Sequence, residues 1–393
     1  MVSKLLTGKS ILIIALSARP FVAAAKKAGY MVTAIDAFAD KQTVELADRT
    51  IIVDYDSNGF NAIALLDAIK TIDVSQYLGF VYGSGFDAQP ELLQQIAKLL
   101  PLIGNLPATV LAVKTATSFF STLTQLNIKH PKVYEVLPAD YHTNVYLKKF
   151  AGGCGGTHIN LVNNQVVNNQ KLLLPNHYYQ QYVAGLSVSL LFVADGENVV
   201  VIGFNEQWLS PAKDMPFRYG GAVGGFDLPK LLQEQLIDAA KKLTQAFGLI
   251  GLNSMDAVVK NDVAYVLEIN PRLSATFDLY KNLDFNLFNL HVQVCLQHLK
   301  QPQSVKPLKQ AQAHAIVYTE SDTYVSTEIH WPTWAVDTPH HANQFQHVKI
   351  LAGEPICTAL ADSDYSEDAK QLAQSRVEVL LEMLKTNHQK VVI

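Results

Sequence analysis

The sequence predicts an α/β protein: a doubly wound parallel sheet at the N-terminus, followed by an α+β part rich in hairpins and a small C-terminal segment. Over roughly the first hundred residues, short apolar runs alternate with helical patterns, the order typical of a parallel sheet covered by helices. Strand patterns then follow one another closely, and turn dipeptides such as Asp195-Gly196 and Asn261-Asp262 separate them, which indicates antiparallel hairpins. A glycine-rich stretch, residues 152–156, joins two of these strands.

The first strand is expected at residues 10–16, an isoleucine-rich run that lies between Gly8 and Pro20. Pro20 suits the first turn of a helix and Gly29 the position after its end, so a helix is expected at 21–28. The other elements of this domain are expected at 30–36 (strand), 51–53 (strand), 62–70 (helix), 79–82 (strand) and 90–100 (helix).

The carboxyl ends of these strands form the expected binding rim, because ligands of parallel sheets bind beyond that edge. Ser17, Asp36 and residues 84–87 follow three of the predicted strands. We therefore expect them at one rim of the N-terminal sheet.

A domain boundary is expected at residues 105–107, an Asn-Leu-Pro sequence. It gives a first domain of residues 1–106, a second of 107–300 and a C-terminal segment of 301–393 that completes the fold. Residues 108–126 show a helical pattern that ends at Asn127. Later strands are expected at 145–150, 157–162, 178–183, 187–194, 199–204, 251–259 and 263–269, and later helices at 228–247, 284–299 and 367–385.

The composition excludes several classes of protein. The chain has 393 residues and a net charge of −4, so it lacks the basic excess of a nucleic-acid-binding protein. Its apolar residues reach 49%, yet runs such as residues 11–16 fall far short of the ~20 residues that cross a membrane, so no membrane partner is expected. Three cysteines are too few for a disulfide scaffold, which makes the cytoplasm the expected location. A signal peptide built from Lys4 and residues 11–16 is the alternative.

Residues 251–272, GLNSMDAVVKNDVAYVLEINPR, carry the most specific chemistry. On a hairpin, Asp256 lies on one strand, and Glu268 and Asn270 share a face of the next. Two carboxylates and an amide oxygen are the hard ligands that Mg²⁺ takes. Arg272 adds a cation beside them, and this combination fits stabilisation of a transferring phosphoryl group. The alternative is a hairpin whose acidic residues only face solvent.

Lys149 stands just before the glycine-rich stretch, which Cys154 interrupts. Backbone N–H groups of such a loop can cradle phosphate oxygens, and a lysine adds a point charge for them. Glycine-rich hairpins are also common without a ligand, so the loop by itself does not decide between the two. Cys154 is interpreted as a small filler residue rather than a nucleophile. The four glycines of this flap are Gly152, Gly153, Gly155 and Gly156.

Taken in order, these motifs resemble the ATP-grasp superfamily, to which biotin carboxylase and D-alanine–D-alanine ligase belong. Lys149 and the glycine loop match the lysine and the phosphate-binding flap of that superfamily. Asp256, Glu268, Asn270 and Arg272 match its metal-binding acid, Glu, Asn and Arg at spacings of 12, 2 and 2.

The resemblance covers residues 10–300 and implies a Rossmann-like domain before a two-lobed α+β ATP-grasp fold, with the lid lobe at residues 130–183. Gln181 departs from the acid usual at the hinge, and Ser187 stands where a ribose-binding Glu is frequent. The residues that the resemblance assigns to ATP are Lys114, Lys149, Gly152, Gly153, Gly155, Gly156, Gln180, Gln181, Tyr182, Val183 and Ser187.

The resemblance implies a ligase that uses ATP and Mg²⁺ or Mn²⁺. ATP phosphorylates a small-molecule carboxylate, and an amine then displaces phosphate to give an amide, ADP and phosphate. Arg272 and Arg218 are the catalytic candidates, Arg218 as a carboxylate clamp, with a surface arginine as its alternative. Similarity to predicted carboligases related to biotin carboxylase suggests an amino-acid or glutamyl ligase step in methanopterin- or methanofuran-type cofactor biosynthesis. A homodimer is expected by analogy.

Two alternatives remain open. A biotin-carboxylase-like or purine-type carboxylating ligase has the same superfamily motifs, although the chain contains no biotin-attachment sequence. A nucleotide-binding regulatory protein without turnover is the other, and the complete Glu268–Asn270 pair argues against it. The sequence does not predict a role for the Trp/Pro-rich residues 331–337.

Overall fold

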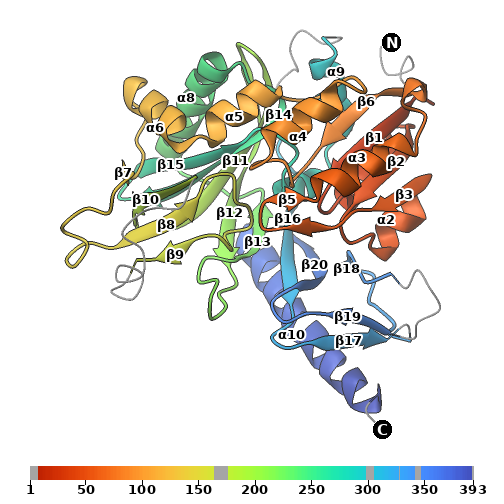
Figure 1. The fold of residues 1–393 in the computed structure, drawn as a ribbon. Coiled ribbons are helices and arrows are strands. Elements are labelled where there is room, and N and C mark those ends of the chain that lie inside the picture. The colour runs from red at the N-terminus through yellow and green to blue at the C-terminus, as the bar shows by residue number, and fades with distance from the viewer. Residues whose placement is uncertain (1–7, 163–175, 298–304, 327, 341–346, 392–393) are drawn as a thin grey trace.

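The structure, a computed structural model, describes residues 8–162, 176–297, 305–326, 328–340 and 347–391 (Figure 1). Lys4 of the signal-peptide alternative and the expected boundary at residues 300/301 lie outside the described residues. The larger sheets of the described part have four, four and eight strands.

The N-terminal sheet is parallel, with strand order β3-β2-β1-β6, as the sequence predicts. Alternate residues of β1 enter two separate hydrophobic clusters, so both faces of the sheet are covered and the strand is apolar throughout. The strands are β1 (Ser10–Ala15), β2 (Met31–Asp36), β3 (Arg49–Ile52) and β6 (Tyr77–Tyr82), and the helices are α1 (Arg19–Lys27), α2 (Lys41–Leu46), α3 (Ala62–Lys70) and α4 (Pro90–Ala97). The hairpin of β4 (Tyr55–Asp56) and β5 (Gly59–Phe60) and the 3-10 helix η2 (Val74–Gln76) complete this part.

The single helix expected at 108–126 is wrong: the structure has two helices, α5 (Pro107–Lys114) and α6 (Ala116–Gln125). Thr115 between them is extended, with φ −81° and ψ 111°. No Pro or Gly marks this break. It follows Lys114, whose ammonium group is held by buried acids described below, and the extended residue lets α6 start in a new direction. Asn127, with φ 55°, follows the end of α6 as expected.

The central sheet has eight antiparallel strands in the order β15-β14-β11-β12-β13-β16-β20-β18. Its two predicted hairpins are confirmed: Gly196 has φ 94°, and Asn261 and Asp262 have φ 48° and 58°, the positive values that tight hairpin turns require. The strands are β11 (Leu186–Asp195), β12 (Val199–Leu209), β13 (Tyr219–Gly224), β14 (Ile250–Lys260), β15 (Val263–Asn270), β16 (Ala311–Tyr318), β18 (Ala335–Val336) and β20 (Pro355–Ser363).

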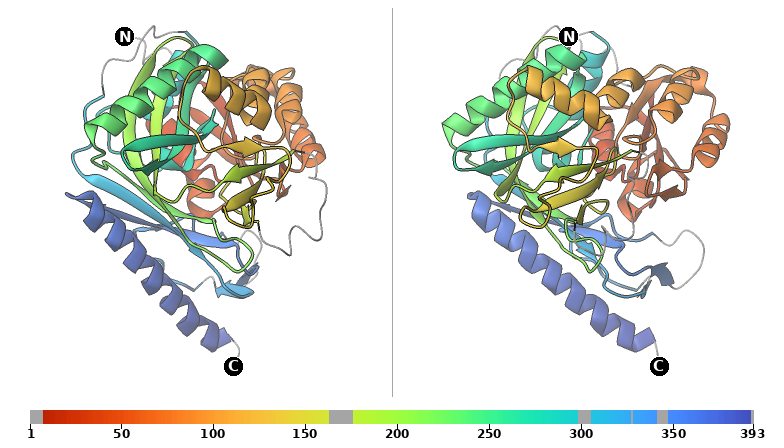
Figure 2. Two further views of the ribbon diagram at one scale, coloured as in Figure 1. Left: turned by 90° about the vertical axis from the view of Figure 1, so that its left-hand side faces the viewer. Right: turned by 60° about the vertical axis from the view of Figure 1, so that its left-hand side comes forward.

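A second four-stranded sheet, β7-β10-β8-β9, lies beside the central sheet (Figures 1 and 2). It falls within residues 130–183, the segment expected as the lid, and is called the lid below. The strand expected at 157–162 is reduced to Asn160–Leu161, because local bonds such as Ile159 N–H to Gly156 C=O (3.2 Å) keep the preceding backbone in turns. The lid strands are β7 (Val133–Tyr134), β8 (Tyr146–Phe150), β9 (Asn160–Leu161) and β10 (His177–Gln181).

The C-terminal segment extends the central sheet rather than packing beside it as a separate layer. β16 pairs with β13, β20 with β16, and the long helix α10 (Ser366–Val391) lies along β16 and β20 (Figure 2). Alanines at the contact let the helix approach the strands closely, for example Ala313, Ala369 and Ala373. A small pair of strands, β17 (Thr323–Ser326) and β19 (His347–Ile350), flanks this end.

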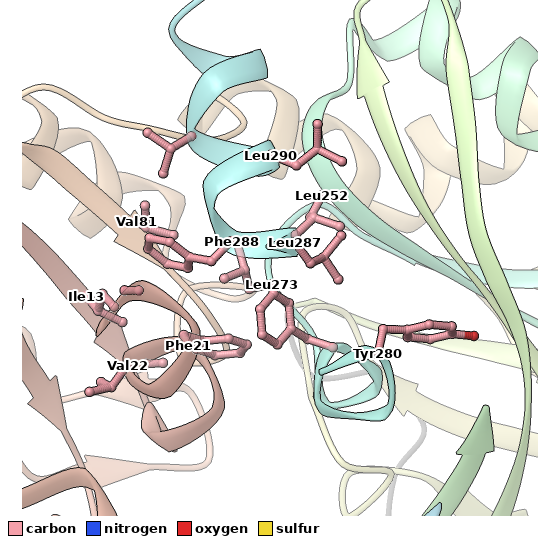
Figure 3. Packing of buried hydrophobic residues seen from close by; sticks show 14 of the residues in the cluster. Ile13, Phe21, Val22, Val81, Leu252, Leu273, Tyr280, Leu287, Phe288 and Leu290 are labelled. Carbon is pink, nitrogen blue, oxygen red and sulfur yellow. The ribbon is translucent and has the colours of Figure 1, made fainter. Parts of the chain in front are cut away.

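One hydrophobic cluster joins the N-terminal sheet to the central sheet (Figure 3). Phe21 of α1 meets Phe277 edge to face, with ring centroids 5.2 Å apart, and Phe288 of α9 (Leu287–Cys295) lies beside them. Phe277 belongs to the 3-10 helix η3 (Ala275–Tyr280), and α8 (Lys230–Phe247) covers another part of the central sheet. The helix expected at 284–299 corresponds to α9, which is shorter than predicted and spans Leu287–Cys295. No helix among the described residues is long and apolar enough to span a membrane.

Candidate active site

The predicted metal ligands meet on the β14–β15 hairpin. Asp256 lies directly opposite Glu268, and Asn270 lies opposite Ser254. The amide of Asn270 donates from Nδ2 to Asp256 Oδ2 (3.0 Å), which ties the second strand to the first carboxylate. The face is partly closed rather than freely solvated: the Glu268 side chain is 36% exposed and Asn270 is 8% exposed. This placement disfavours the solvent-facing alternative.

The two facing carboxylates differ in their affinity for a proton. Burial raises the pKa of Asp256 to about 7, and the charge of Glu268 adds to the shift. Burial also acts on Glu268, but Lys114, Lys149 and His158 outweigh it and lower its pKa to about 2. Like charges this close disfavour double ionisation, so Asp256 keeps its proton to a higher pH than an ordinary carboxyl does.

Lys114 connects this pair to a buried acid that the sequence reasoning did not assign to the site. Its Nζ lies 2.9 Å from Asn270 Oδ1, 3.4 Å from Glu268 Oε2 and 3.1 Å from Asp87 Oδ1. The other oxygen of Asp87 accepts from Arg272 Nε at 2.7 Å. Asp87 thus holds the two cations of the site side by side, and its place in the expected rim segment 84–87 was the only sequence signal for it.

A second residue that sequence reasoning missed is Gln207 on β12. Its Nε2 donates to Asp256 Oδ1 (3.2 Å), and its Oε1 accepts from Ser187 Oγ (3.3 Å). Ser187, the position expected at the ribose, is thereby joined through Gln207 and Asp256 to Asn270. Gln207 lies in an otherwise ordinary strand, so no spacing pattern pointed to it.

Lys149 lies on the lid, where it is 5% exposed. Its Nζ donates to Gln180 Oε1 (3.4 Å) on the neighbouring strand β10. The Nε2 atom of Gln180 is buried and makes no hydrogen bond in the described part of the chain. A nucleotide that enters beside Lys149 finds here an unused amide donor.

The residues expected at the hinge come next along the chain, after Gln180. The N–H groups of Gln181 and Tyr182 are bonded to Lys132 and Val145 within the lid, at 2.8 Å and 2.9 Å. The half-buried Val183 and the exposed Tyr182 lead out of the lid toward β11. The predicted nucleotide residues therefore surround the junction of the lid and the central sheet.

The glycine flap is folded against both neighbouring parts of the molecule. A Cβ at Gly152 would lie 2.6 Å from the carbonyl oxygen of Asp87, and one at Gly156 would lie 1.9 Å from that of Phe217. Gly155 has open space around it, and its carbonyl accepts from the Tyr219 N–H at 2.9 Å. Glycine at 152 and 156 is thus required by close backbone approach and by positive φ values of 85° and 72°.

His158, which the sequence analysis did not single out, lies against the glycine flap. Its ring packs on Gly153, where a Cβ would lie 2.3 Å from the ring. Its Nδ1 atom is buried without a hydrogen-bond partner among the described residues. Burial and the charge of Lys149 lower its pKa to about 4, so the ring is neutral near pH 7.

Arg218 lies in the interior of the protein. It is 6% exposed, which makes the surface-arginine alternative wrong. Its guanidinium donates to the carbonyls of Ser210 (2.8 Å) and Gly353 (3.2 Å) and lies 3.8 Å from the centre of the Tyr318 ring. With a further bond to Ser210 Oγ (3.4 Å), these contacts use three of the five N–H groups of the guanidinium, so a role of Arg218 as a carboxylate clamp stays a prediction.

The donor set fits a divalent cation and a nucleoside triphosphate. Asp256 and Glu268 offer facing carboxyl groups, and Asn270 offers an amide oxygen. Around them stand the ammonium groups of Lys114 and Lys149 and the guanidinium of Arg272. The unpartnered atoms Gln180 Nε2 and His158 Nδ1 add two positions for a polar ligand.

Comparison with known proteins agrees with this geometry. Residues 114–276 match the ATP-grasp domain family. Over 250 residues, 58% of this chain, the sequence is 23% identical to the carbamoyl phosphate synthase large chain of Pseudomonas aeruginosa, and over 176 residues, 44% of this chain, it is 28% identical to the tyramine–L-glutamate ligase of Methanocaldococcus fervens. The chain spans only 23% and 51% of the lengths of these relatives.

Solved structures resemble this fold over almost the whole chain. The N5-carboxyaminoimidazole synthetase of Staphylococcus aureus, complexed with ADP, has a TM-score of 0.68 at 14% identity, covering 94% of this chain and 97% of its own. Biotin carboxylase of Campylobacter jejuni has a TM-score of 0.70 at 14% identity, covering 97% and 92%. The L-amino acid ligase of Bacillus licheniformis has a TM-score of 0.66 at 14% identity, covering 94% and 97%.

Proposed function

Because the chain belongs to the ATP-grasp superfamily, we propose that it is an ATP-dependent ligase that joins a carboxylate to an amine and releases ADP and phosphate. The observation that carries this proposal is the pairing of Asp87 with two cations. One buried carboxylate holds Lys114 and Arg272 side by side, directly next to the facing acids Asp256 and Glu268. Such a site is suited to hold a triphosphate together with its cation.

In the proposed reaction, Lys149, Lys114 and the flap hold the inner phosphates, and Arg272 lies beside the terminal one. A carboxylate oxygen attacks the γ-phosphorus, the bond to the β-phosphate oxygen breaks, and ADP leaves. The amine nitrogen then attacks the acyl phosphate carbon, loses a proton, and expels phosphate. Asp256, Glu268 and Asn270 would hold Mg²⁺ or Mn²⁺, which when bound neutralises charge on the phosphate oxygens.

The nature of the nucleophile separates the two ligase alternatives. The names of two similar proteins, the L-amino acid ligase and the tyramine–L-glutamate ligase, contain compounds that carry an amino group. N5-carboxyaminoimidazole synthetase and biotin carboxylase favour the carboxylating alternative by their names. We favour the amine, and within it an amino-acid or glutamyl ligase step in the biosynthesis of a one-carbon cofactor. A cytoplasmic location and a homodimer stay predictions.

The nucleotide-binding regulatory protein is the candidate from another class. It needs the lid, but it has no use for Glu268, Asn270 and Arg272 together beside Lys114. The presence of this complete set around one buried acid favours turnover.

The test is ADP release with a panel of carboxylates and amines, followed by transfer of label from ¹⁸O-carboxylate. We expect ADP and labelled phosphate only when a carboxylate and an amine are both present. Formation of AMP, or strict dependence on bicarbonate, would overturn the amine ligase. ATP binding without turnover across the panel would favour the regulatory protein.

A further inference from the structure

The ammonium group of Lys114 lies against two of the three predicted metal ligands. Its Nζ donates to Asn270 Oδ1 (2.9 Å) and to Glu268 Oε2 (3.4 Å). Its contact with Asp87 Oδ1 (3.1 Å) is an ion pair, and that oxygen has no hydrogen-bond partner among the described residues. The ammonium group therefore directs its hydrogen bonds toward the oxygens that a divalent cation needs, rather than toward Asp87.

The amide oxygen of Asn270 has no lone pair left in this arrangement. Such an oxygen accepts two hydrogen bonds, and Asn270 Oδ1 already accepts from Lys114 and, at 3.4 Å, from Arg272 Nη2. Each oxygen of Asp256 also accepts one bond, Oδ1 from Gln207 Nε2 and Oδ2 from Asn270 Nδ2. A divalent cation that takes Asn270 Oδ1 as a ligand must therefore displace Lys114 or Arg272.

Of these two donors, Lys114 is the one that can leave. The guanidinium of Arg272 is held at two other points, by Asp87 Oδ2 at Nε (2.7 Å) and by the carbonyl of Leu273 at Nη1 (3.3 Å). Lys114 carries its ammonium group on a flexible four-carbon stem, so the group can turn away while the backbone stays in place.

A cavity beside Lys114 gives the ammonium group a place to go. It has a volume of about 350 Å³, and Lys114, Thr117 and Tyr178 are among the residues that line it. Lys149 of the lid lies over the Tyr178 ring, with its Nζ 5.9 Å from the ring centre. Phosphate groups that enter between the two lysines attract both, and this attraction competes with the hold of Glu268 on Lys114.

From this arrangement we infer that Lys114 is a positioning residue that takes the place of the divalent cation until a nucleotide binds. Without nucleotide, its ammonium group holds Glu268 and Asn270. When phosphates enter, the ammonium group turns to them and leaves the two ligand oxygens to the metal. Metal and nucleotide thus each favour binding of the other through Lys114. This inference deepens the proposed function and rests on the cation and the nucleotide that the function requires.

Binding of Mn²⁺ alone to the full chain, measured by equilibrium dialysis, tests this role. Lys114→Met removes the ammonium group and should tighten Mn²⁺ binding about tenfold or more, because the cation no longer has to displace hydrogen bonds between charged and polar groups. Lys149→Met is the matched control, since it removes the same charge from a lysine whose Nζ donates to Gln180. It should tighten binding at most about threefold, as a nearby charge without direct contact does.

Two results of this comparison would overturn the inference. Equal tightening in Lys114→Met and Lys149→Met would show a general effect of charge. No tightening in Lys114→Met would show that the lysine does not compete with the metal.

Two further measurements cover the case in which Lys114→Met does not fold. Lys114→Gln keeps an uncharged donor for Asp87 and should change Mn²⁺ affinity in the same direction. In the wild type, acetylation of lysines by acetic anhydride is followed by mass spectrometry. Saturating Mn²⁺ should increase the labelling rate of Lys114, because the ammonium group is driven into the cavity, and should leave that of the surface Lys242 unchanged. A labelling rate of Lys114 that does not respond to Mn²⁺ would contradict the displacement.

Failure of the proposed function gives a different result. If Mn²⁺ does not bind even with ADP present, the metal site that the proposed function requires is refuted. If Mn²⁺ binds with ADP, but binds alone with equal affinity to the wild type and Lys114→Met, only the role of Lys114 is refuted. Hydroxylamine in place of the amine traps an acyl phosphate as a hydroxamate, so hydroxamate formation by the wild type tests the ligase independently of Lys114.

Discussion

At the scale of single residues, the site depends on one buried carboxylate, Asp87, which pairs with two cations. Asp87 is 5% exposed and pairs with Lys114 through one oxygen and with Arg272 through the other. The charges of both cations outweigh burial and lower the pKa of Asp87. The two cations therefore stay close together near the expected phosphate position, although they repel one another.

Replacing Asp87 by alanine should leave two buried cations without their common partner. Loss of one member of a buried ion pair costs about 3–5 kcal/mol, so urea unfolding should show a decrease of that size in the free energy of unfolding. Asp67→Ala is the matched control, because Asp67 is 62% exposed and pairs with Lys70 at the surface. It should change the free energy by about 0.5 kcal/mol or less. Equal effects of the two substitutions would contradict the assigned role of Asp87.

Glu268→Gln should abolish ATP turnover and leave the fold intact. The substitution removes one charge beside the proposed cation and the phosphates, and loss of a key electrostatic group costs ~10²-fold or more in rate. ADP release measures the rate, and circular dichroism checks the fold. Glu234→Gln, on the exposed face of α8, is the control. A Glu268→Gln protein that keeps more than about a tenth of the wild-type rate would remove Glu268 from the metal site.

The acids of the hairpin were predictable as a group, whereas their register and their partners were not. A regular register from the two-residue turn would pair Asp256 with Leu267, and a register shift between Asp256 and Ala257 brings Glu268 opposite Asp256 instead. Asp87 and Gln207 reach the same site from segments 169 and 49 residues before Asp256, and no local pattern encodes such contacts. Long-range polar contacts of this kind depend on the completed fold.

At the scale of elements, the flap is shaped by what its backbone touches. Gly152 approaches Asp87 and Gly156 approaches Phe217, so the loop bridges the N-terminal part and the central sheet. The sequence indicated a flap between two strands but not the surfaces it meets. The break at Thr115 was equally hidden, because the apolar pattern continues through it and no Pro or Gly marks it.

Gly156→Ala and Gly155→Ala form a matched pair within the flap. Both glycines have positive φ, 72° and 64°, so both substitutions strain the backbone by about 1–3 kcal/mol. Only at Gly156 does the new Cβ meet a backbone atom, the Phe217 oxygen. We expect Gly156→Ala to lower kcat/KM for ATP at least about tenfold more than Gly155→Ala, because displacement of positioning groups is costly. Equal losses would show that the described closed position of the flap is not the active one.

At the scale of the whole molecule, one arginine connects three distant parts of the chain. Arg19 of α1 pairs with Asp278 of η3 at 2.7 Å and with Asp337, beside β18, at 2.6 Å. Thr338 accepts at its carbonyl from the N–H of Lys41 on α2 (2.9 Å). The Trp/Pro-rich segment whose role the sequence left open thus fastens the C-terminal part to the N-terminal sheet, a contact across about 300 residues that periodicity cannot reveal.

The same junction holds acids with an unusual proton affinity. Burial raises the pKa of Asp36 to about 6 and that of Asp40 to about 7, and the charge of Asp337 adds to both shifts. The nearby Arg19 of α1 pairs with Asp278 and Asp337 rather than with these two acids. In the unfolded chain these carboxyls titrate near ~3.9. At these two carboxyls the folded chain therefore binds more protons than the unfolded chain between about pH 4 and pH 7.

This difference in proton binding predicts how the stability of the junction changes with pH. The contribution of Asp36 and Asp40 to stability is fully present below about pH 4 and is lost as the pH rises through their folded pKa values, because the acids must then ionise while buried. Asp40→Asn removes one of these ionisations and keeps a side-chain oxygen for the Thr43 N–H that caps α2. The Tm of Asp40→Asn minus that of the wild type should increase as the pH rises from 5 to 8, and at pH 8 the variant should be the more stable protein.

The control is Asp73→Asn, at the exposed cap of η2. Its Tm difference from the wild type should not change over this range, because the pKa of Asp73 is lowered by its bonds to Ser75 and its charge is constant. If Asp40→Asn instead melted lower than the wild type at pH 8, the ionised form of Asp40 would be the one that stabilises the junction, and the acids beside Arg19 would have to be paired more completely than the structure describes.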